Sequence, residues 1–183
     1  MTNAAKPPAD QLRRLDKHWH LATDDAEVAI TELEFSLLRV ASAFERWQSD
    51  CLACCHGNSF SGADTSVLHV IRMHERSKSI SEIGRLLKRD DQSNLQYSIR
   101  KLLKAGLIEK TSGGGKKGVT YQVSNLGHQV TDRYAEFRKE LLTSLATTVF
   151  ASHDLEAVAK TMNLMSGVYD QASCVAATHR VPA

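Results

Sequence analysis

The sequence lacks the features that mark membrane and secreted proteins. No stretch approaches the roughly 18 consecutive apolar residues of a transmembrane helix. The N-terminal segment is polar and contains prolines, without the apolar run of a signal peptide. We therefore expect a cytoplasmic protein with no membrane partner, beginning with a flexible arm over residues 1–24.

Catalytic signatures are also missing. The sequence has no activated-nucleophile pattern, no pair of catalytic carboxylates and no phosphate-binding glycine fingerprint. Its glycine run at 113–115 lies between two predicted strands rather than before a helix. We therefore expect no enzyme activity and no cofactor.

Cysteine is scarce and clustered. Three of the four cysteines lie in CLACCH, as Cys51, Cys54 and Cys55, followed by His56. Without a secretion signal, a disulfide framework is not expected. The CxxC spacing leaves three interpretations open: core residues, a redox sensor, or a metal site completed by Cys174 or a partner chain.

The positive charge is concentrated in the middle of the chain. The net charge is only +2, but the segment from Arg76 to Gly118 holds 11 Lys and Arg residues against 4 Asp and Glu residues. The rest of the chain is therefore net acidic. A basic middle in an acidic chain indicates that a polyanion docks there.

Long amphipathic helices are predicted at both ends. A helix over about 25–55 carries a heptad seam, and further helices follow over 124–151 and from about Asp154. The seam consists of Ile30, Leu33, Leu37, Val40, Phe44, Trp47, Cys51 and Cys54. A helix of this length cannot bury its seam against itself. We therefore expect a homodimer whose helical dimerisation region comprises residues 25–60 and 125–178.

The sequence of residues 61–124 predicts a compact unit of short helices and strands, in contrast to the long helices on either side. The expected elements are helices over 64–75, 80–87 and 92–104, and strands over 107–111 and 119–123. Ser79 with Glu82 predicts a capping box, and Asp90 and Asp91 compete to cap the next helix. Two helices joined by a tight turn, followed by a basic hairpin, present one helix to a DNA groove.

Four segments carry a family resemblance: SVLHVIRM (66–73), SISEIGRLL (79–87), SNLQYSIRKLLKAGLIEK (93–110) and TYQVSNLG (120–127). They resemble the winged helix-turn-helix of the MarR family of bacterial transcription regulators. The resemblance implies a mainly α fold, with long N- and C-terminal dimerisation helices and a small β-hairpin wing. It also implies a dimeric, sequence-specific DNA-binding transcriptional regulator, acting as a repressor, whose DNA affinity a small molecule modulates.

The helix over 92–104 provides the candidate DNA-reading side chains. Base contacts are expected from Gln92, Ser93, Asn94, Gln96, Tyr97 and Arg100. Phosphate contacts are expected from Arg85, Lys101, Lys104, Lys116 and Lys117. The family wing commonly carries an Asp and two Arg near its tip, whereas this tip is SGGGKKG, so we expect its lysines to contact phosphates. A dimer predicts a pseudo-palindromic double-stranded site.

The resemblance also implies a small aromatic or acidic ligand between the dimerisation helices and the DNA-reading unit. The candidate lining residues are Trp47, His69, Arg72 and Tyr134, and Arg72 could pair with a carboxylate. Two alternatives differ from this function. The same fold could act as a cysteine-based redox or metal sensor, or as a winged-helix interaction protein that does not bind DNA.

Overall fold

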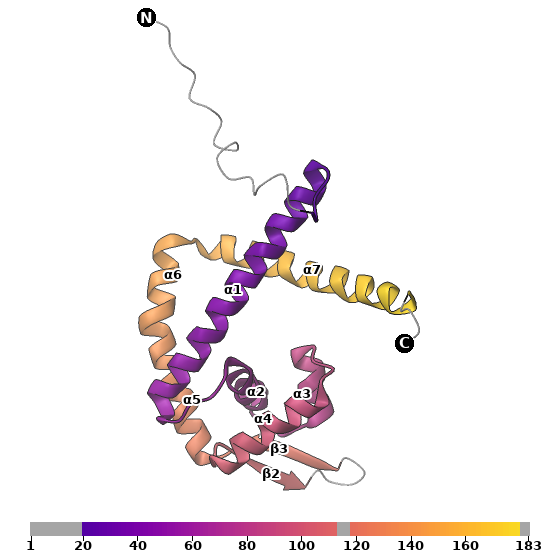
Figure 1. The fold of residues 1–183 in the computed structure, drawn as a ribbon. Coiled ribbons are helices and arrows are strands. Elements are labelled where there is room, and N and C mark those ends of the chain that lie inside the picture. The colour runs from indigo at the N-terminus through magenta and orange to yellow at the C-terminus, as the bar shows by residue number, and fades with distance from the viewer. Residues whose placement is uncertain (1–19, 113–117, 180–183) are drawn as a thin grey trace, which may run out of the picture. The chain divides into compact units, whose positions relative to one another are not determined.

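A computed structural model describes residues 20–112 and 118–179 (Figure 1). Most of the predicted N-terminal arm and the wing lysines Lys116 and Lys117 lie outside these residues. The chain divides into a first unit, Met1–Thr131, and a second unit, Asp132–Ala183. Each unit is described by itself.

Helix α1 (Asp25–His56) confirms the predicted long helix. Asp24 caps its start, because the Asp24 carboxylate accepts the Glu27 backbone N–H at 2.9 Å. The helix ends at Gly57, whose φ of 80° is a left-handed conformation that glycine adopts readily. Within the described structure, Ile30, Val40 and Phe44 of the predicted seam are more than half exposed. An exposed apolar stripe of this kind marks an interaction surface.

The helix-turn-helix consists of α2 (Gly62–Arg72), α3 (Ile80–Leu87) and α4 (Gln92–Lys104), with a 3-10 turn at Met73–Glu75. Helix α2 packs against α1, α3 and α4. The apolar part of the core they share consists of Leu52, Val67, Leu68, Ile71, Ile83, Leu95, Ile99 and Leu102. Periodic burial of this kind holds α4 in a fixed position with its other face outward.

The small sheet has three strands where the sequence predicts two. Strands β1 (Lys78–Ser79), β2 (Ile108–Ser112) and β3 (Val119–Val123) pair antiparallel in the order β1-β3-β2. The predicted hairpin is confirmed, with its first strand shifted by one residue. Strand β1 was not predicted, because two residues are too few to show an alternating pattern.

The helix caps differ in detail from the sequence prediction. Ser61 and Asp64 form a reciprocal capping box that starts α2 two residues earlier than expected. The Ser79 hydroxyl accepts the Glu82 N–H at 3.2 Å, as predicted, but the Glu82 carboxylate is held by Arg76. The predicted box at Ser79 is therefore only half present.

The chain continues as α5 (Asn125–Phe137), a π-helical segment at Arg138–Thr143, α6 (Ser144–Val149) and α7 (Ser152–Thr178). Helix α7 begins two residues before the expected start at about Asp154. Asp154 lies inside the first turn, where its carboxylate accepts the Ala151 N–H at 3.3 Å. Over the residues described, no helix combines the length and the apolar character needed to cross a membrane.

Candidate nucleic-acid interface and polar pocket

Helix α4 presents a polar face that is free of the core. Its buried side consists of Leu95, Ser98, Ile99 and Leu102. Its exposed side consists of Gln92, Ser93, Asn94, Gln96, Tyr97, Arg100 and Lys104. All six residues expected to contact bases are therefore exposed on one helix, as a helix that enters a groove requires.

Asp91 caps α4 and orients its first turn. Its carboxylate accepts the Asn94 backbone N–H at 3.0 Å and also a hydrogen bond from the Asn94 side-chain amide. The competition between Asp90 and Asp91 is thus decided for Asp91. The cap fixes the orientation of the Asn94 amide, which is one of the candidate base-contacting groups.

Lys101 has a different role from the one expected. Its ammonium lies 2.8 Å from the Asp64 carboxylate and 5.0 Å from the centre of the Phe60 ring. These contacts join α4 to the start of α2. We therefore exclude Lys101 from the set of phosphate contacts and assign it to the packing between these helices.

Asp64 makes this contact pH-dependent. Its burial raises the pKa, but hydrogen bonds from Lys101, Ser98 and Ser61 outweigh burial and hold the pKa below the ordinary 3.8. The stabilisation is therefore complete above pH 3.8 and is lost as the pH falls through the folded-state pKa.

Asp64→Asn should lower the free energy of unfolding at pH 7 by about 1–3 kcal/mol, because a buried charged acceptor is lost. The difference in the free energy of unfolding between the variant and the wild type should shrink as the pH falls below 3.8. In this range Asp64 becomes protonated in the unfolded chain first, and the wild type loses the stabilisation that its charge provides. Urea unfolding at pH 7 and at pH 3 measures both effects. Asp50→Asn, at an exposed site, is the control. A difference that stays constant across this range would refute the charged role of Asp64.

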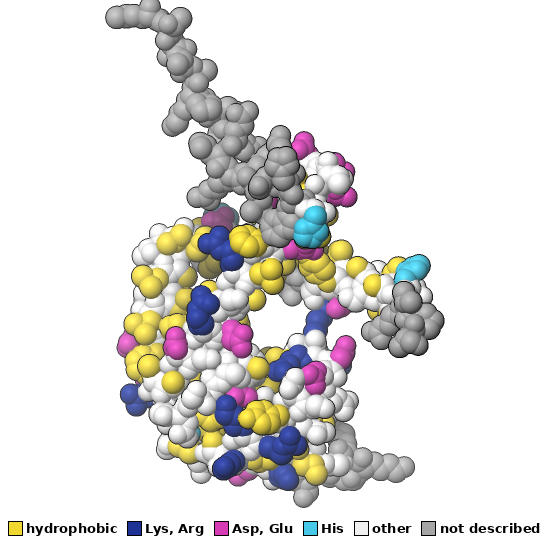
Figure 2. Space-filling view, in the orientation of Figure 1, with side chains coloured by type: hydrophobic (Ala, Val, Ile, Leu, Met, Phe, Trp, Pro, Cys, Tyr) yellow, Lys and Arg dark blue, Asp and Glu magenta, His cyan; other side chains and the backbone are white. Residues whose placement is uncertain are grey.

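Other cations of the basic segment are also engaged inside the unit. Arg76 forms a two-point ion pair with Glu82, and Lys78 is fully buried. The exposed cations near α4 include Arg85, Lys104 and Lys110. Figure 2 shows Lys and Arg side chains gathered over the part of the surface that α4 and the hairpin form. The basic surface is therefore smaller than the sequence count implies.

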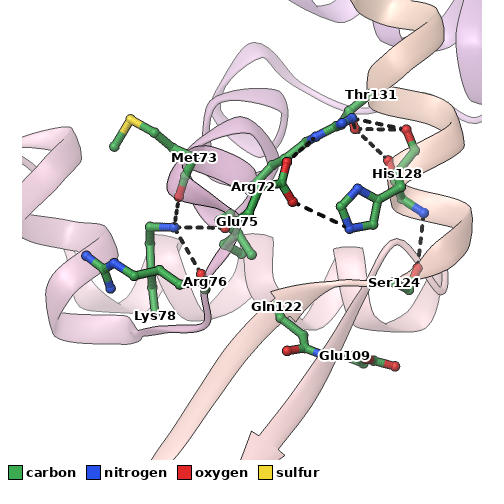
Figure 3. A network of polar contacts seen from close by, with 12 residues as sticks. Arg72, Met73, Glu75, Arg76, Lys78, Glu109, Gln122, Ser124, His128 and Thr131 are labelled. Carbon is green, nitrogen blue, oxygen red and sulfur yellow. Dashed lines mark hydrogen bonds and ion pairs between the residues drawn. The ribbon is translucent and has the colours of Figure 1, made fainter.

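The buried Lys78 side chain caps the carbonyl groups at the C-terminal end of α2. Its ammonium donates to the carbonyls of Ile71 at 3.0 Å, of Arg76 at 3.1 Å and of Met73 (Figure 3). Burial lowers the pKa of Lys78. The enclosed turn is unusual, because His74 and Glu75 have φ values of 66° and 47°. Consecutive left-handed residues other than glycine are strained.

A polar pocket of about 270 Å³ lies beside this turn, between the end of α2, strands β2 and β3, and the start of α5. Its lining residues are Ile71, Arg72, Glu75, Arg76, Glu109, Gln122, Val123, Asn125 and His128. We call it the α2–α5 pocket. Of the expected ligand residues, only Arg72 lines it. Trp47 and His69 are half-buried on α1 and α2, and Tyr134 is buried in the second unit.

Sequence reasoning did not identify Glu75 and His128 as pocket residues. They are 53 positions apart and come together at 3.9 Å only through the fold. No local spacing or helical period in the sequence connects two residues that are so far apart. Their polar character in a basic, amphipathic region was the sole signal, and many surface residues share it.

The cysteine cluster lies at the end of α1. Cys51 is buried, and burial followed by the neighbouring Cys55 and Cys54 raises its pKa to about 11. A thiol with this pKa is protonated at neutral pH and is a poor nucleophile or metal ligand. In the part of the chain that the structure describes, no group of three or more His, Cys, Asp or Glu residues could hold a metal. These observations favour the core interpretation for Cys51.

Comparisons with known proteins agree with this architecture. Residues 60–127 match the family model described as a winged helix DNA-binding domain. A search of curated proteins found no match. Similar solved structures include a cysteine-to-serine mutant of MarR from E. coli complexed with operator DNA. It is 17% identical with a TM-score of 0.63, over 78% of this chain and 99% of that chain.

Two further structures support the same fold. Sco3205, a MarR family transcriptional regulator from Streptomyces coelicolor in complex with DNA, is 15% identical with a TM-score of 0.63, over 79% of this chain and 92% of that chain. AbfR of Staphylococcus epidermidis is 14% identical with a TM-score of 0.61, over 78% of this chain and 92% of that chain. The expected mainly helical fold with a β-hairpin wing is therefore confirmed.

Proposed function

We propose that the chain is a dimeric, sequence-specific DNA-binding transcriptional regulator that acts as a repressor. The observation that carries the proposal is the exposed polar face of α4, held outward by an apolar core beside a basic hairpin. The structural neighbours that are complexed with DNA, one of them with operator DNA, support it through the shared fold. The fold supports a regulatory role rather than an enzymatic one.

In this proposal, α4 enters the major groove and reads bases directly. The amides of Asn94 and Gln96 suit adenine, and the Arg100 guanidinium suits guanine. Arg85 and Lys104 contact phosphates, together with the wing lysines Lys116 and Lys117. Residues 61–124 thus form the DNA-binding domain.

Dimerisation is proposed through residues 25–60 and 125–178. The exposed apolar side chains on α1 support this, as do Leu155, Val158, Met162 and Val168, which are each at least 42% exposed on α7. Covering apolar area of this kind stabilises association. A two-fold dimer binds a pseudo-palindromic operator with half-sites about one helical turn apart. A small-molecule ligand would change DNA affinity by favouring one arrangement of the two α4 helices.

Arg100→Ala should weaken binding to the selected operator by about 1–3 kcal/mol, and it should relax specificity at one base pair, because Arg100 is assigned to guanine. The operator is first obtained by selection from random DNA, with and without a thiol reductant. Fluorescence anisotropy then measures affinity. Lys160→Ala, an equal charge change on α7, is the control.

Three results would contradict parts of this function. Equal losses in the two variants would show that Arg100 acts only through charge. An intact dimer that selects no DNA sequence would favour a protein-interaction role. Selection that depends on the reductant would favour the redox-sensor alternative.

A further inference from the structure

The α2–α5 pocket holds an arginine and a histidine, Arg72 and His128, that a carboxylate already faces (Figure 3). We propose that this pocket binds a compact, hydrophilic carboxylate that also carries a hydroxyl or ammonium group, and that Glu75 lies where the ligand carboxylate binds. The proposal deepens the ligand regulation suggested above. Only its consequence for DNA affinity rests on the proposed function.

Glu75 is held loosely by two neighbours, Arg72 and His128. One carboxylate oxygen lies 3.5 Å from Arg72 Nε, and the other lies 3.9 Å from His128 Nε2. Good charge-assisted hydrogen bonds are about 2.7–2.9 Å long. The Glu75 side chain is 66% exposed, compared with 23% for Arg72. An incoming carboxylate can therefore replace Glu75 without a large loss of native interaction.

Arg72 is fixed in the orientation that the ligand requires. One guanidinium nitrogen donates to the His128 carbonyl at 3.1 Å and to the Thr131 hydroxyl, both on α5. The Nε edge faces Glu75 on the pocket side. A planar guanidinium anchored in this way binds a carboxylate with little loss of side-chain freedom.

The turn that carries Glu75 is held in place by other residues. His74 and Glu75 have left-handed φ angles, and the Lys78 contacts hold the turn in this conformation. Because the exposed Glu75 side chain turns about its own bonds, it can leave the pocket while the turn keeps its backbone conformation. Glu75 thus behaves as an internal competitor for the anion position.

The opposite wall selects the rest of the ligand. The Gln122 amide donates to the Glu109 carboxylate at 2.6 Å, and Asn125 lies beside them in the lining. These groups suit a hydroxyl or an ammonium. The apolar lining is limited to Ile71 and Val123. At about 270 Å³, the pocket lies at or below the roughly 300–1,000 Å³ of drug-sized sites. A lipophilic aromatic acid therefore fits it less well than a small polar acid.

Binding here would act on the link between the DNA-reading unit and the helix that follows it. Arg72 ties the end of α2 to His128 and Thr131 of α5, and α5 continues into the second unit. A ligand that binds the Arg72 guanidinium would change the strength of the hydrogen bonds between Arg72 and α5. That contact is a physical route from the pocket to the position of α4 in a dimer.

Titration calorimetry on the full chain at pH 7 tests the site without DNA. The probes are L-malate, L-glutamate and benzoate. Malate or glutamate should bind at least about tenfold more tightly than benzoate. Glu75→Gln, which keeps the side-chain size and removes the competing charge, should tighten the better probe by about 3- to 10-fold. The exposed Glu136→Gln is the matched control and should not change the affinity.

The outcomes separate clearly. Tighter binding in Glu75→Gln, with an unchanged control, supports the site. Benzoate binding as tightly as both polar acids overturns the ligand class. No binding by any probe, or weaker binding in Glu75→Gln, overturns the site itself. If the wild-type protein binds malate but selects no DNA sequence, the proposed function is wrong, whereas the pocket assignment still stands.

Discussion

Lys78→Met should lower the free energy of unfolding by about 3–5 kcal/mol, because it removes a buried charge from its partners. The methionine keeps the apolar stem but cannot donate to the carbonyls of Ile71, Met73 and Arg76. Each buried carbonyl left without a donor costs about 1–3 kcal/mol, reduced where water enters. The strained turn at His74 and Glu75 would also lose its central support. Urea unfolding followed by circular dichroism measures the change.

The control for Lys78 is Lys110→Met, which makes the same substitution at an exposed position of β2. Its effect should stay within about 0.5 kcal/mol. If the two variants were equally stable, Lys78 would not hold the end of α2. Because Lys78→Met loosens the end of α2, it is also expected to weaken operator binding, whereas Lys110→Met should leave the fold of α4 unchanged.

The α4 face shows what local pattern can predict. Leu95, Ile99 and Leu102 repeat with the period of a helix, and the structure buries all three. The residues between them are therefore exposed by the same regularity. The polar reading surface follows from the sequence because it depends on one helix and one core.

Cation pairing shows what local pattern cannot predict. A count along the sequence gives Lys78, Arg76 and Lys101 the same weight as the cations that we propose contact DNA. The fold engages them with the end of α2, with Glu82 and with Asp64 respectively. The Lys101–Asp64 partners are 37 residues apart. No spacing rule in the sequence predicts such a contact. The number of basic residues in a segment therefore overestimates the positive charge that is available to bind a polyanion.

The α2–α5 pocket was missed for the same physical reason. Its walls come from 71–76, from 109 and 122–123, and from 125–128, which meet only after the hairpin closes. The sequence identified Arg72 as a carboxylate partner, but it could not show that Glu75 already faces it. Local helical patterns thus locate the reading helix, whereas a pocket requires the tertiary structure.

Gly127→Ala should lower the free energy of unfolding by about 3 kcal/mol or more, because there is no room for a methyl group. A Cβ at this position would lie 2.0 Å from the Leu107 carbonyl oxygen and 2.6 Å from a Val123 methyl. The Leu107 carbonyl already accepts the Ser124 N–H at 3.1 Å, where the chain passes from β3 into α5. The Leu107 carbonyl is part of the backbone, so it cannot move away without separating α5 from the hairpin. The variant should therefore distort the α2–α5 pocket as well.

Gly167→Ala in α7 is the matched control, and its expected effect has the opposite sign. A Cβ there meets nothing within 4 Å, so alanine should only add helix propensity, worth about 0.5–1 kcal/mol of stabilisation. Thermal unfolding of both variants compares the same substitution in two helices. Stabilisation by both would mean that α5 does not approach Leu107 closely in solution. Destabilisation at Gly127 alone, with weaker malate binding, would show that the close approach of α5 to the hairpin shapes the pocket. Destabilisation at Gly167 as well would instead indicate that a partner surface packs against this position of α7.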